Sequence, residues 1–204
     1  MDLASVLENR RQTFLFNDDV PSKAVINEIL DAVHQYAPSK QNRVRYNIEV
    51  YRNDDPEKRM KIYEAGKSSP VREDARHNPQ LLAPWLLFLS NRNVKNRGHS
   101  IEGFVENEPN EMPSEGEIGM DIGLAASYII LKAIDMGLNY GYCACITKQE
   151  NFKGIINDYN SPRLIICLGY RNDAKGWTCP VYNKWEPIVP QIFKPEKNEY
   201  IRYI

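Results

Sequence analysis

Two adjacent arginines near the N-terminus, Arg10 and Arg11, are the first residues whose type suggests chemistry. Guanidinium groups stay charged at any physiological pH and form paired, charge-assisted hydrogen bonds with phosphate oxygens. The pair follows a segment that Asp2 can cap as a short helix, and an apolar, extended run ends at Phe16. This pattern is suited to a phosphate site, although arginines at such a position are more often simply solvated.

A tight polar loop follows the next predicted helix and is the second candidate site. Its hydroxyl, amide and ammonium groups are suited to the edge of a heteroaromatic ring, which offers hydrogen-bond donors and acceptors in one plane. The loop residues are Pro38, Ser39, Lys40, Gln41 and Asn42. The alternative interpretation is an ordinary helix-to-strand connection.

A run of small residues, Gly141 to Cys145, is the third candidate site, because backbone without bulky side chains can approach a flat ligand. Cys143 and Cys145 alternate along one predicted strand. We favour small buried hydrophobic side chains over reactive thiols at both positions.

Other catalytic patterns are missing from the sequence. It contains no GxSxG, HExxH, P-loop or GxGxxG motif. The three histidines are scattered, and the four cysteines have neither CxxC nor zinc-type spacing. The sequence therefore predicts neither an acid–base dyad nor a metal site.

The element that must position these groups is a long apolar helix, predicted from about Ile118 to Met136. It carries only three charges, Asp121, Lys132 and Asp135, and its apolar residues occupy every angular sector. We expect a helix buried on most sides, with Asp121 near the first turn, where a negative charge suits the helix dipole. Gly137 is the expected C-terminal stop. The charges argue against a membrane span.

Shorter elements flank this helix. Helices are predicted to begin after the capping residues Ser22 and Asp55 and to end near Tyr36 and Gly66. Strands are predicted where Tyr46, Ile48 and Val50 alternate and in three further segments: 85–89, the run after Gly137, and 163–170. A short surface helix is predicted within 151–159.

Two segments are expected to have little regular structure. Residues 90–117 are expected to form a polar lid or insertion, and residues 171–204, with four prolines, are expected to form an extended arm.

The totals fit one domain spanning residues 1–204. The formal net charge is −1, from 26 basic and 27 acidic residues, so no global field favours nucleic acid or an anionic membrane. The N-terminus has no secretory pattern, and the cysteines read as reduced thiols. We expect a cytoplasmic protein.

In their order along the chain, these features resemble the FMN-dependent nitroreductase family. The matching segments are Arg10-Arg11-Gln12, Pro38-Ser39-Lys40-Gln41-Asn42, Gly137-Leu138-Asn139 and Leu168-Gly169-Tyr170. They span nearly the whole chain. The resemblance implies an α+β fold, specifically a three-layer α/β/α sandwich with a mixed, mainly antiparallel sheet and a long buried central helix. It also implies a homodimer that holds FMN at the subunit interface, with Gly119, Gly123 and Ser127 as a smooth contact face on the central helix.

Site residues follow from the same resemblance. It implies that Arg10 and Arg11 bind the phosphate and ribityl end of FMN, with Gln12 at the position of a family serine. The other cofactor-binding residues that it implies are Pro38, Ser39, Lys40 and Asn42 at the flavin ring, the backbone of Cys143, Ala144 and Cys145 near the reactive nitrogen, and Lys184 at the phosphate.

Two departures from the family pattern bear on activity. Phe14 occupies the position of a cation that stabilises the anionic reduced flavin. Val44-Arg45-Tyr46 replaces the Gln-Pro-Trp that closes the ring-binding loop. The matching residues therefore support the prediction of FMN binding better than they support the prediction of efficient turnover with a nicotinamide nucleotide.

The resemblance implies an oxidoreductase in which NAD(P)H reduces the flavin and the flavin reduces a nitroaromatic, quinone or similar acceptor. The cofactor would do the redox work, which agrees with the missing acid–base dyad. The first alternative is a non-catalytic or specialised FMN-binding protein of the same fold, which Phe14 favours. The second is a protein-interaction module, which the acidic insertion and the extended arm favour.

Overall fold

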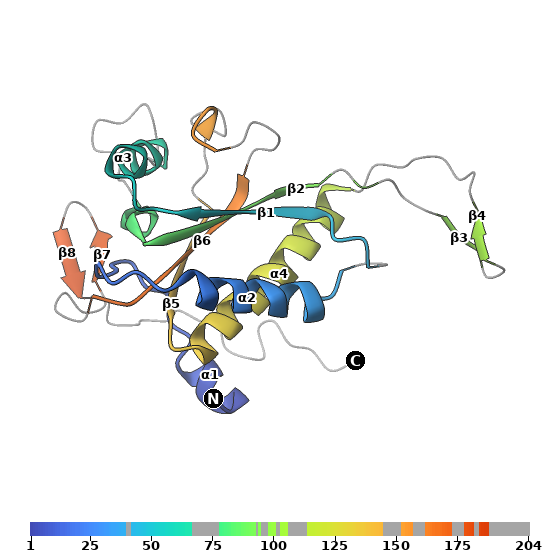
Figure 1. Cartoon of the computed structure of the whole chain (residues 1–204), viewed down its shortest axis with the longest axis horizontal. Coiled ribbons are helices and arrows are strands. Elements are labelled where there is room, and N and C mark those ends of the chain that lie inside the picture. The colour runs from blue at the N-terminus through green and yellow to red at the C-terminus, as the bar shows by residue number, and fades with distance from the viewer. Residues whose placement is uncertain are drawn as a thin grey trace.

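A four-stranded sheet forms the centre of the computed structural model (Figure 1). The residues that the structure describes are 1–39, 42–66, 78–92, 94, 98–100, 103–105, 114–144, 152–156, 162–172, 178–181 and 184–187. In spatial order the strands are β1 (Tyr46–Arg52), β2 (Trp85–Asn91), β6 (Pro162–Gly169) and β5 (Asn139–Cys143), and all pairs are antiparallel. A parallel bridge from Gln12 to Tyr140 adds the N-terminal segment at the β5 edge. The predicted α+β class with a mainly antiparallel sheet is confirmed.

Helices cover both faces of this sheet. Successive residues of β2 point to opposite sides, so each face carries apolar side chains that a helix can bury. Leu87 and Leu89 pack in one hydrophobic cluster with α2 (Lys23–Tyr36) and α4 (Glu115–Asp135). Leu86 and Phe88 pack in a second cluster with α3 (Pro56–Ala65) and the 3₁₀ turn η2 (Pro79–Leu82). The predicted strand at 85–89 is confirmed, and it is buried on both faces.

The remaining elements are short. Helix α1 (Leu3–Glu8) packs against α4. Two hairpins stand apart from the main sheet: β3 (Gly98–Ser100) with β4 (Gly103–Val105), and β7 (Thr178–Val181) with β8 (Lys184–Pro187). They fall within the predicted insertion and the predicted extended arm.

Local capping explains why the predicted helices begin where they do. The Ser22 side chain accepts a hydrogen bond from the Val25 N–H, and Asp55 accepts from the N–H groups of Glu57 and Lys58. These bonds satisfy N–H groups that the first helical turn leaves without partners. Gly137 follows α4 with a φ of 79°, as expected for a left-handed C-terminal stop.

The start of the central helix was predicted wrongly. Ser114 and Glu117 form a capping box, so α4 begins at Glu115 and runs for 21 residues. Asp121 therefore lies in the second turn and is fully buried. Its role is an ion pair with Arg45 and not an interaction with the helix dipole.

Two smaller predictions also need correction. Val50 is 41% exposed, so the expected buried alternation of β1 ends at Ile48. Residues 152–156, part of the predicted surface helix 151–159, form a turn whose Phe152 is buried against Phe88. The described part of this segment is therefore a turn held by a buried aromatic side chain, and not an exposed surface helix.

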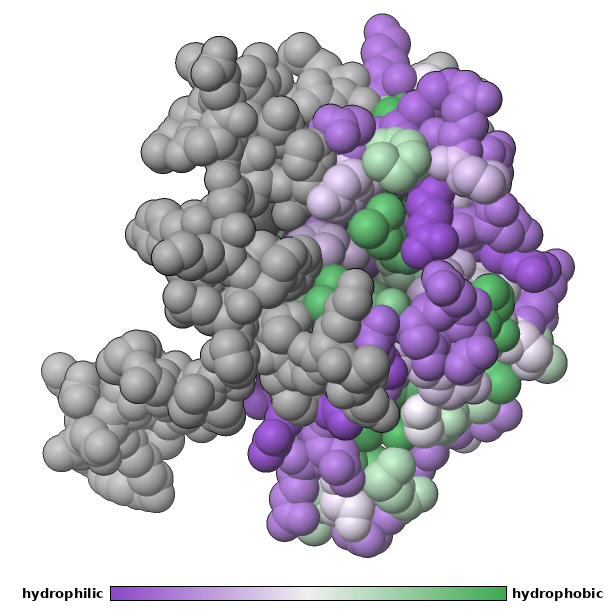
Figure 2. Space-filling view, turned by 90° about the vertical axis from the view of Figure 1, so that its left-hand side faces the viewer, coloured by the Kyte–Doolittle hydropathy of each residue, from purple (hydrophilic) through white to green (hydrophobic). Residues whose placement is uncertain are grey.

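The surface shown in Figure 2 is mainly hydrophilic in its coloured part, with hydrophobic residues scattered between the polar ones. Scattered apolar side chains are normal on a protein surface. Within the described ranges, no helix combines the length and apolar character that a membrane span needs.

Candidate cofactor site

The N-terminal basic segment lies in extended form along the outer edge of β5. The Thr13 N–H donates to the Tyr140 carbonyl at 2.7 Å, and the Gln12 side-chain amide donates to the Tyr142 carbonyl at 3.1 Å. The structure thus brings together two of the three candidate sites, the segment at Arg10 and the run that ends β5.

Gly141 permits this close approach. A Cβ atom at position 141 would lie 2.7 Å from both the Thr13 carbonyl oxygen and the Gln80 side-chain nitrogen. Contacts this short force a neighbour to move. At Gly141, the backbone that approaches is therefore the chain's own and not the flat ligand that the sequence suggested.

Arg10 and Arg11 point to different surroundings. The Arg10 guanidinium donates to the Tyr140 hydroxyl at 3.4 Å. Burial raises the pKa of Tyr140, and the Arg10 charge partly offsets that increase. Arg11 instead lines a depression of about 470 Å³ beside Arg171 and Asn139. Successive residues of an extended chain face opposite sides, so the two arginines do not form one clamp.

The thiol of Cys143, the last residue of β5, does not face solvent. Cys143 is buried in the cluster on the α3 side of the sheet, so the interpretation as a small hydrophobic residue is confirmed for this position. Cys167 is buried in the same cluster, and this burial raises the pKa of its thiol. Ala144 is exposed directly after the strand. Cys145 lies outside the described residues.

The described residues of the ring-binding candidate loop and the two that follow it, 38–39 and 42–44, include two with left-handed backbone. The Asn42 N–H donates to the Ser39 carbonyl at 3.0 Å, and the Val44 N–H donates to the Ser39 hydroxyl at 2.9 Å. Asn42 and Val44 have φ values of 54° and 49°. This conformation is uncommon for asparagine and strongly disfavoured for β-branched valine. Pro38 and Asn42 are exposed, and Lys40 lies outside the described residues.

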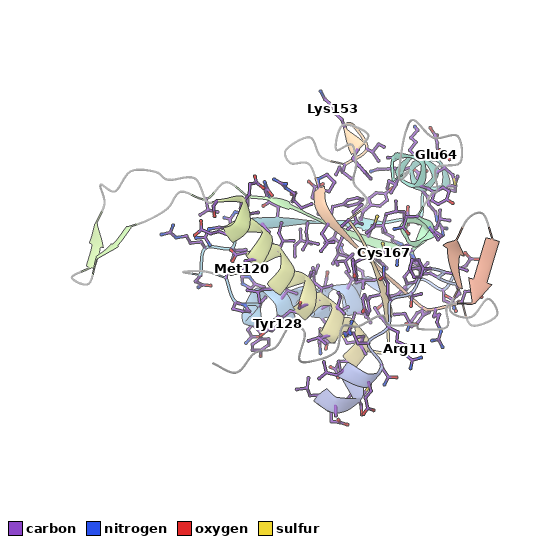
Figure 3. The ribbon with its side chains drawn as sticks, turned by 180° about the vertical axis from the view of Figure 1, so that it is seen from behind. Arg11, Glu64, Met120, Tyr128, Lys153 and Cys167 are labelled. Carbon is purple, nitrogen blue, oxygen red and sulfur yellow. The ribbon has the colours of Figure 1, made fainter. Side chains whose placement is uncertain are left out.

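The structure does not bring this loop next to Arg10 within one chain. The loop ends at Arg45, which contacts Asp121 in the second turn of α4, whereas Arg10 contacts Tyr140 beyond the other end of that helix. The intervening part of α4 is roughly 20 Å long at about 1.5 Å per residue. Figure 3 shows Arg11 and Met120 at opposite ends of α4.

Three features of this region were not found from the sequence. Tyr140 accepts the Arg10 hydrogen bond, Arg171 shares the depression with Arg11, and Arg45 pairs with Asp121. Arg171 directly follows the Gly169-Tyr170 motif, which was the available signal for it.

Lys184 is the first residue of β8. In the described part of the chain, no cluster of three or more His, Cys, Asp or Glu residues is placed to hold a metal ion.

Comparisons with known proteins agree with this architecture. The structure is similar to the FMN-dependent nitroreductase NfnB from Mycobacterium smegmatis in complex with NADPH, with a TM-score of 0.65, 16% identity and coverage of 100% of both chains. It is also similar to a nitroreductase family protein from Clostridium difficile 630, with a TM-score of 0.63, 14% identity and coverage of 100% of this chain and 98% of that chain. A third similar structure is a nitroreductase with bound FMN from Bacteroides fragilis NCTC 9343, with a TM-score of 0.62, 16% identity and coverage of 85% of this chain and 90% of that chain.

At such identities the structural likeness establishes the fold. No curated protein matches the chain significantly. The model of the nitroreductase family, however, matches residues 7–170 of the sequence. A match over most of the chain shows that this protein belongs to the nitroreductase family.

Proposed function

We propose that this protein is an FMN-dependent oxidoreductase that takes reducing equivalents from NADH or NADPH and passes them to a small acceptor such as a nitroaromatic or a quinone. Family membership supports the proposal, as do the NADPH in the Mycobacterium smegmatis structure and the FMN in the Bacteroides fragilis structure. Bound FMN would supply the redox chemistry by accepting a hydride and releasing electrons to the acceptor. The observation that carries the proposal is the Arg10–Thr13 segment fixed along β5.

The residues of this segment fit the phosphate and ribityl end of FMN. Arg10 and Gln12 alternate along the extended segment, so their side chains share one side. Arg10 is exposed, which leaves its guanidinium accessible to a phosphate. Gln12 uses its amide nitrogen for Tyr142, and its side-chain carbonyl can accept a hydrogen bond from a ribityl hydroxyl. Arg11 faces a different depression, so we assign the phosphate primarily to Arg10.

We further propose that the active form is a homodimer in which the loop 38–44 of one subunit, the candidate loop 38–42 extended to the residue before Arg45, serves the flavin beside Arg10 of the other subunit. The separation of Ser39 and Arg10 along α4 supports this arrangement, since one chain does not join them. The exposed face of α4 also supports it: among the described residues, a Cβ atom added at Gly119 or Gly123 would meet nothing within 4 Å. Packing within the described part of the chain does not require these helix-interior glycines, which each cost about 1 kcal/mol relative to alanine.

Phe14 supports a second candidate function, an FMN-binding protein with weak or no reductase activity. Its half-buried aromatic ring occupies the position where the family resemblance implies a cation. Without that charge, the reduced flavin anion would lose a stabilising interaction. This candidate shares the cofactor and the binding segment with the first and differs only in turnover.

Two measurements on the purified protein separate these functions. FMN titration followed by flavin fluorescence tests binding, and anaerobic stopped-flow mixing of the loaded protein with NADH and NADPH tests reduction. We expect the visible flavin absorbance to be lost with at least one nucleotide. A flavin that binds but stays oxidised with both nucleotides would leave the second candidate, and a protein that binds no FMN would refute both.

A further inference from the structure

A buried ion pair joins the end of the loop 38–44 to the central helix. The Arg45 guanidinium lies 3.3 Å from an Asp121 carboxylate oxygen, and the two side chains are 1% and 0% exposed. The Arg45 backbone N–H donates to the same oxygen at 3.3 Å. Asp121 therefore holds both the side chain and the backbone of the residue that ends the loop.

Stability alone is a poor explanation for such a pair. Removing two charges from water is costly, and a well-packed apolar pair of similar volume is often equally stable or more stable. Tyr46, the next residue and the first of β1, is buried in an apolar cluster. The chain thus places a full charge pair at a position next to its apolar core.

The backbone at the C-terminal side of this loop has a conformation that its residue types disfavour. Asn42 and Val44 both have left-handed backbone conformations. Arg92, just beyond β2, adds a second anchor: its N–H donates to the Arg45 carbonyl at 3.0 Å, and its guanidinium donates to the Val44 carbonyl at 3.2 Å. The loop is thus fixed at its C-terminal side from α4 and from the end of β2.

We propose that the Arg45–Asp121 pair positions Ser39 and Asn42 before the cofactor binds, so that FMN does not have to order these two residues. Pre-ordering a binding loop lowers the entropic cost of binding. In this chain the pair would do the work of the Gln-Pro-Trp segment that the family resemblance implies and Val44-Arg45-Tyr46 replaces. The role of FMN in this inference rests on the proposed function. The ordering of the loop by the ion pair does not depend on that function.

Hydrogen–deuterium exchange on the FMN-free protein tests the ordering directly. In Asp121→Asn we expect the amides of Asn42, Val44 and Arg45 to exchange about tenfold faster or more, because one charge-assisted contact is lost. Amides of β2 and β6 should keep their rates. FMN affinity, measured by fluorescence at a temperature where circular dichroism shows both proteins folded, should fall by about tenfold.

Lys132→Gln is the matched control. It removes a charge from the same helix, together with ion pairs to Glu28 at 3.0 Å and Asp135 at 3.3 Å, but lies far from the loop. We expect it to change neither the loop exchange nor the FMN affinity. The double variant Arg45→Met with Asp121→Leu keeps the test valid if Asp121→Asn does not fold, because an apolar pair preserves packing without the charge contact.

A folded double variant with faster loop exchange would support the proposal. Unchanged loop exchange and unchanged FMN affinity in a folded variant would overturn it. An increase in exchange that is equal in β2, β6 and the loop would also overturn it, because the pair would then act only on global stability. If the unsubstituted protein binds no FMN, the proposed function fails, and the exchange rates still decide whether the pair orders the loop.

Discussion

The Gln80 side-chain amide donates a 2.8 Å hydrogen bond to the Thr13 carbonyl, across the space that a side chain at Gly141 would occupy. This one contact joins three segments that are far apart in the sequence: the N-terminal basic segment, the turn η2 and the edge strand β5. All three residues are buried. The position of Arg10 therefore depends on a glycine more than a hundred residues away.

Gly141→Ala should displace the basic segment. Its new Cβ atom would come within 2.7 Å of two polar atoms, and overpacking of this kind costs about 1–3 kcal/mol. Urea unfolding should show this loss in the free energy of unfolding, and FMN affinity should fall with it. Gly116→Ala is the control: the nearest atom to its added Cβ is 3.9 Å away, so this change should raise helix stability slightly. Equal effects of the two substitutions would contradict the role of Gly141.

Arg10→Met should weaken FMN binding far more than Arg11→Met. A lost charge-assisted hydrogen bond costs about 1.5–3 kcal/mol, which corresponds to roughly a tenfold to hundredfold loss of affinity. Arg11 lines a separate depression, so its replacement should change affinity by less than about threefold through long-range charge alone. Fluorescence titrations at two salt concentrations measure both effects. If the two variants lose affinity equally, the assignment of the phosphate to Arg10 is wrong.

Features governed by local chemistry could be predicted from the sequence. The caps at Ser22 and Asp55 and the stop at Gly137 need only a few neighbouring residues, and the structure has them where they were expected. The start of α4 was missed although its capping box is also local. Ser114 and Glu117 lie in an acidic stretch that reads as an insertion, and this composition masked the helix start.

Features that depend on distant pairing could not be predicted. Arg45 and Asp121 are 76 positions apart, and neither residue type in its own context indicates a buried partner. Arg10 and Arg11 point in different directions because their segment pairs with β5. The order of motifs along the chain does not reveal this pairing. The cofactor roles of the candidate residues stay predictions that the binding experiments decide.

Alkaline pH should destabilise the protein through its buried tyrosines. Burial raises the pKa of Tyr46 above 10.0, and the nearby Asp121 charge raises it further. A raised pKa in the folded state means that the contribution to stability is full below the unfolded value and is lost as pH rises through the folded value. The free energy of unfolding should therefore fall above pH 10. Tyr46→Phe should reduce this fall, while Tyr36→Phe, at a side chain that is 61% exposed, should not. Identical pH profiles for both variants would exclude Tyr46 as a cause.

The exposed glycine face of α4 should be required for dimer formation. Gly119, Gly123 and Ser127 lie four residues apart and are all exposed, so they form one smooth stripe. Gly123→Leu adds bulk where nothing in the described structure lies within 4 Å, so the isolated subunit should fold normally. Sedimentation velocity should show a shift from dimer to monomer. FMN affinity should fall in parallel, because each site would lose the loop 38–44 of the second subunit.

Lys61→Leu on α3 separates this effect from a general response to added surface hydrophobicity. Its side chain is 60% exposed on the opposite face of the sheet, so the substitution adds an apolar surface without touching the stripe. It should leave the sedimentation coefficient and the FMN affinity unchanged. A Gly123→Leu protein that remains dimeric and binds FMN as before would show that the subunits associate through another surface. Association through that other surface would then have to bring Ser39 of one subunit close to Arg10 of the other.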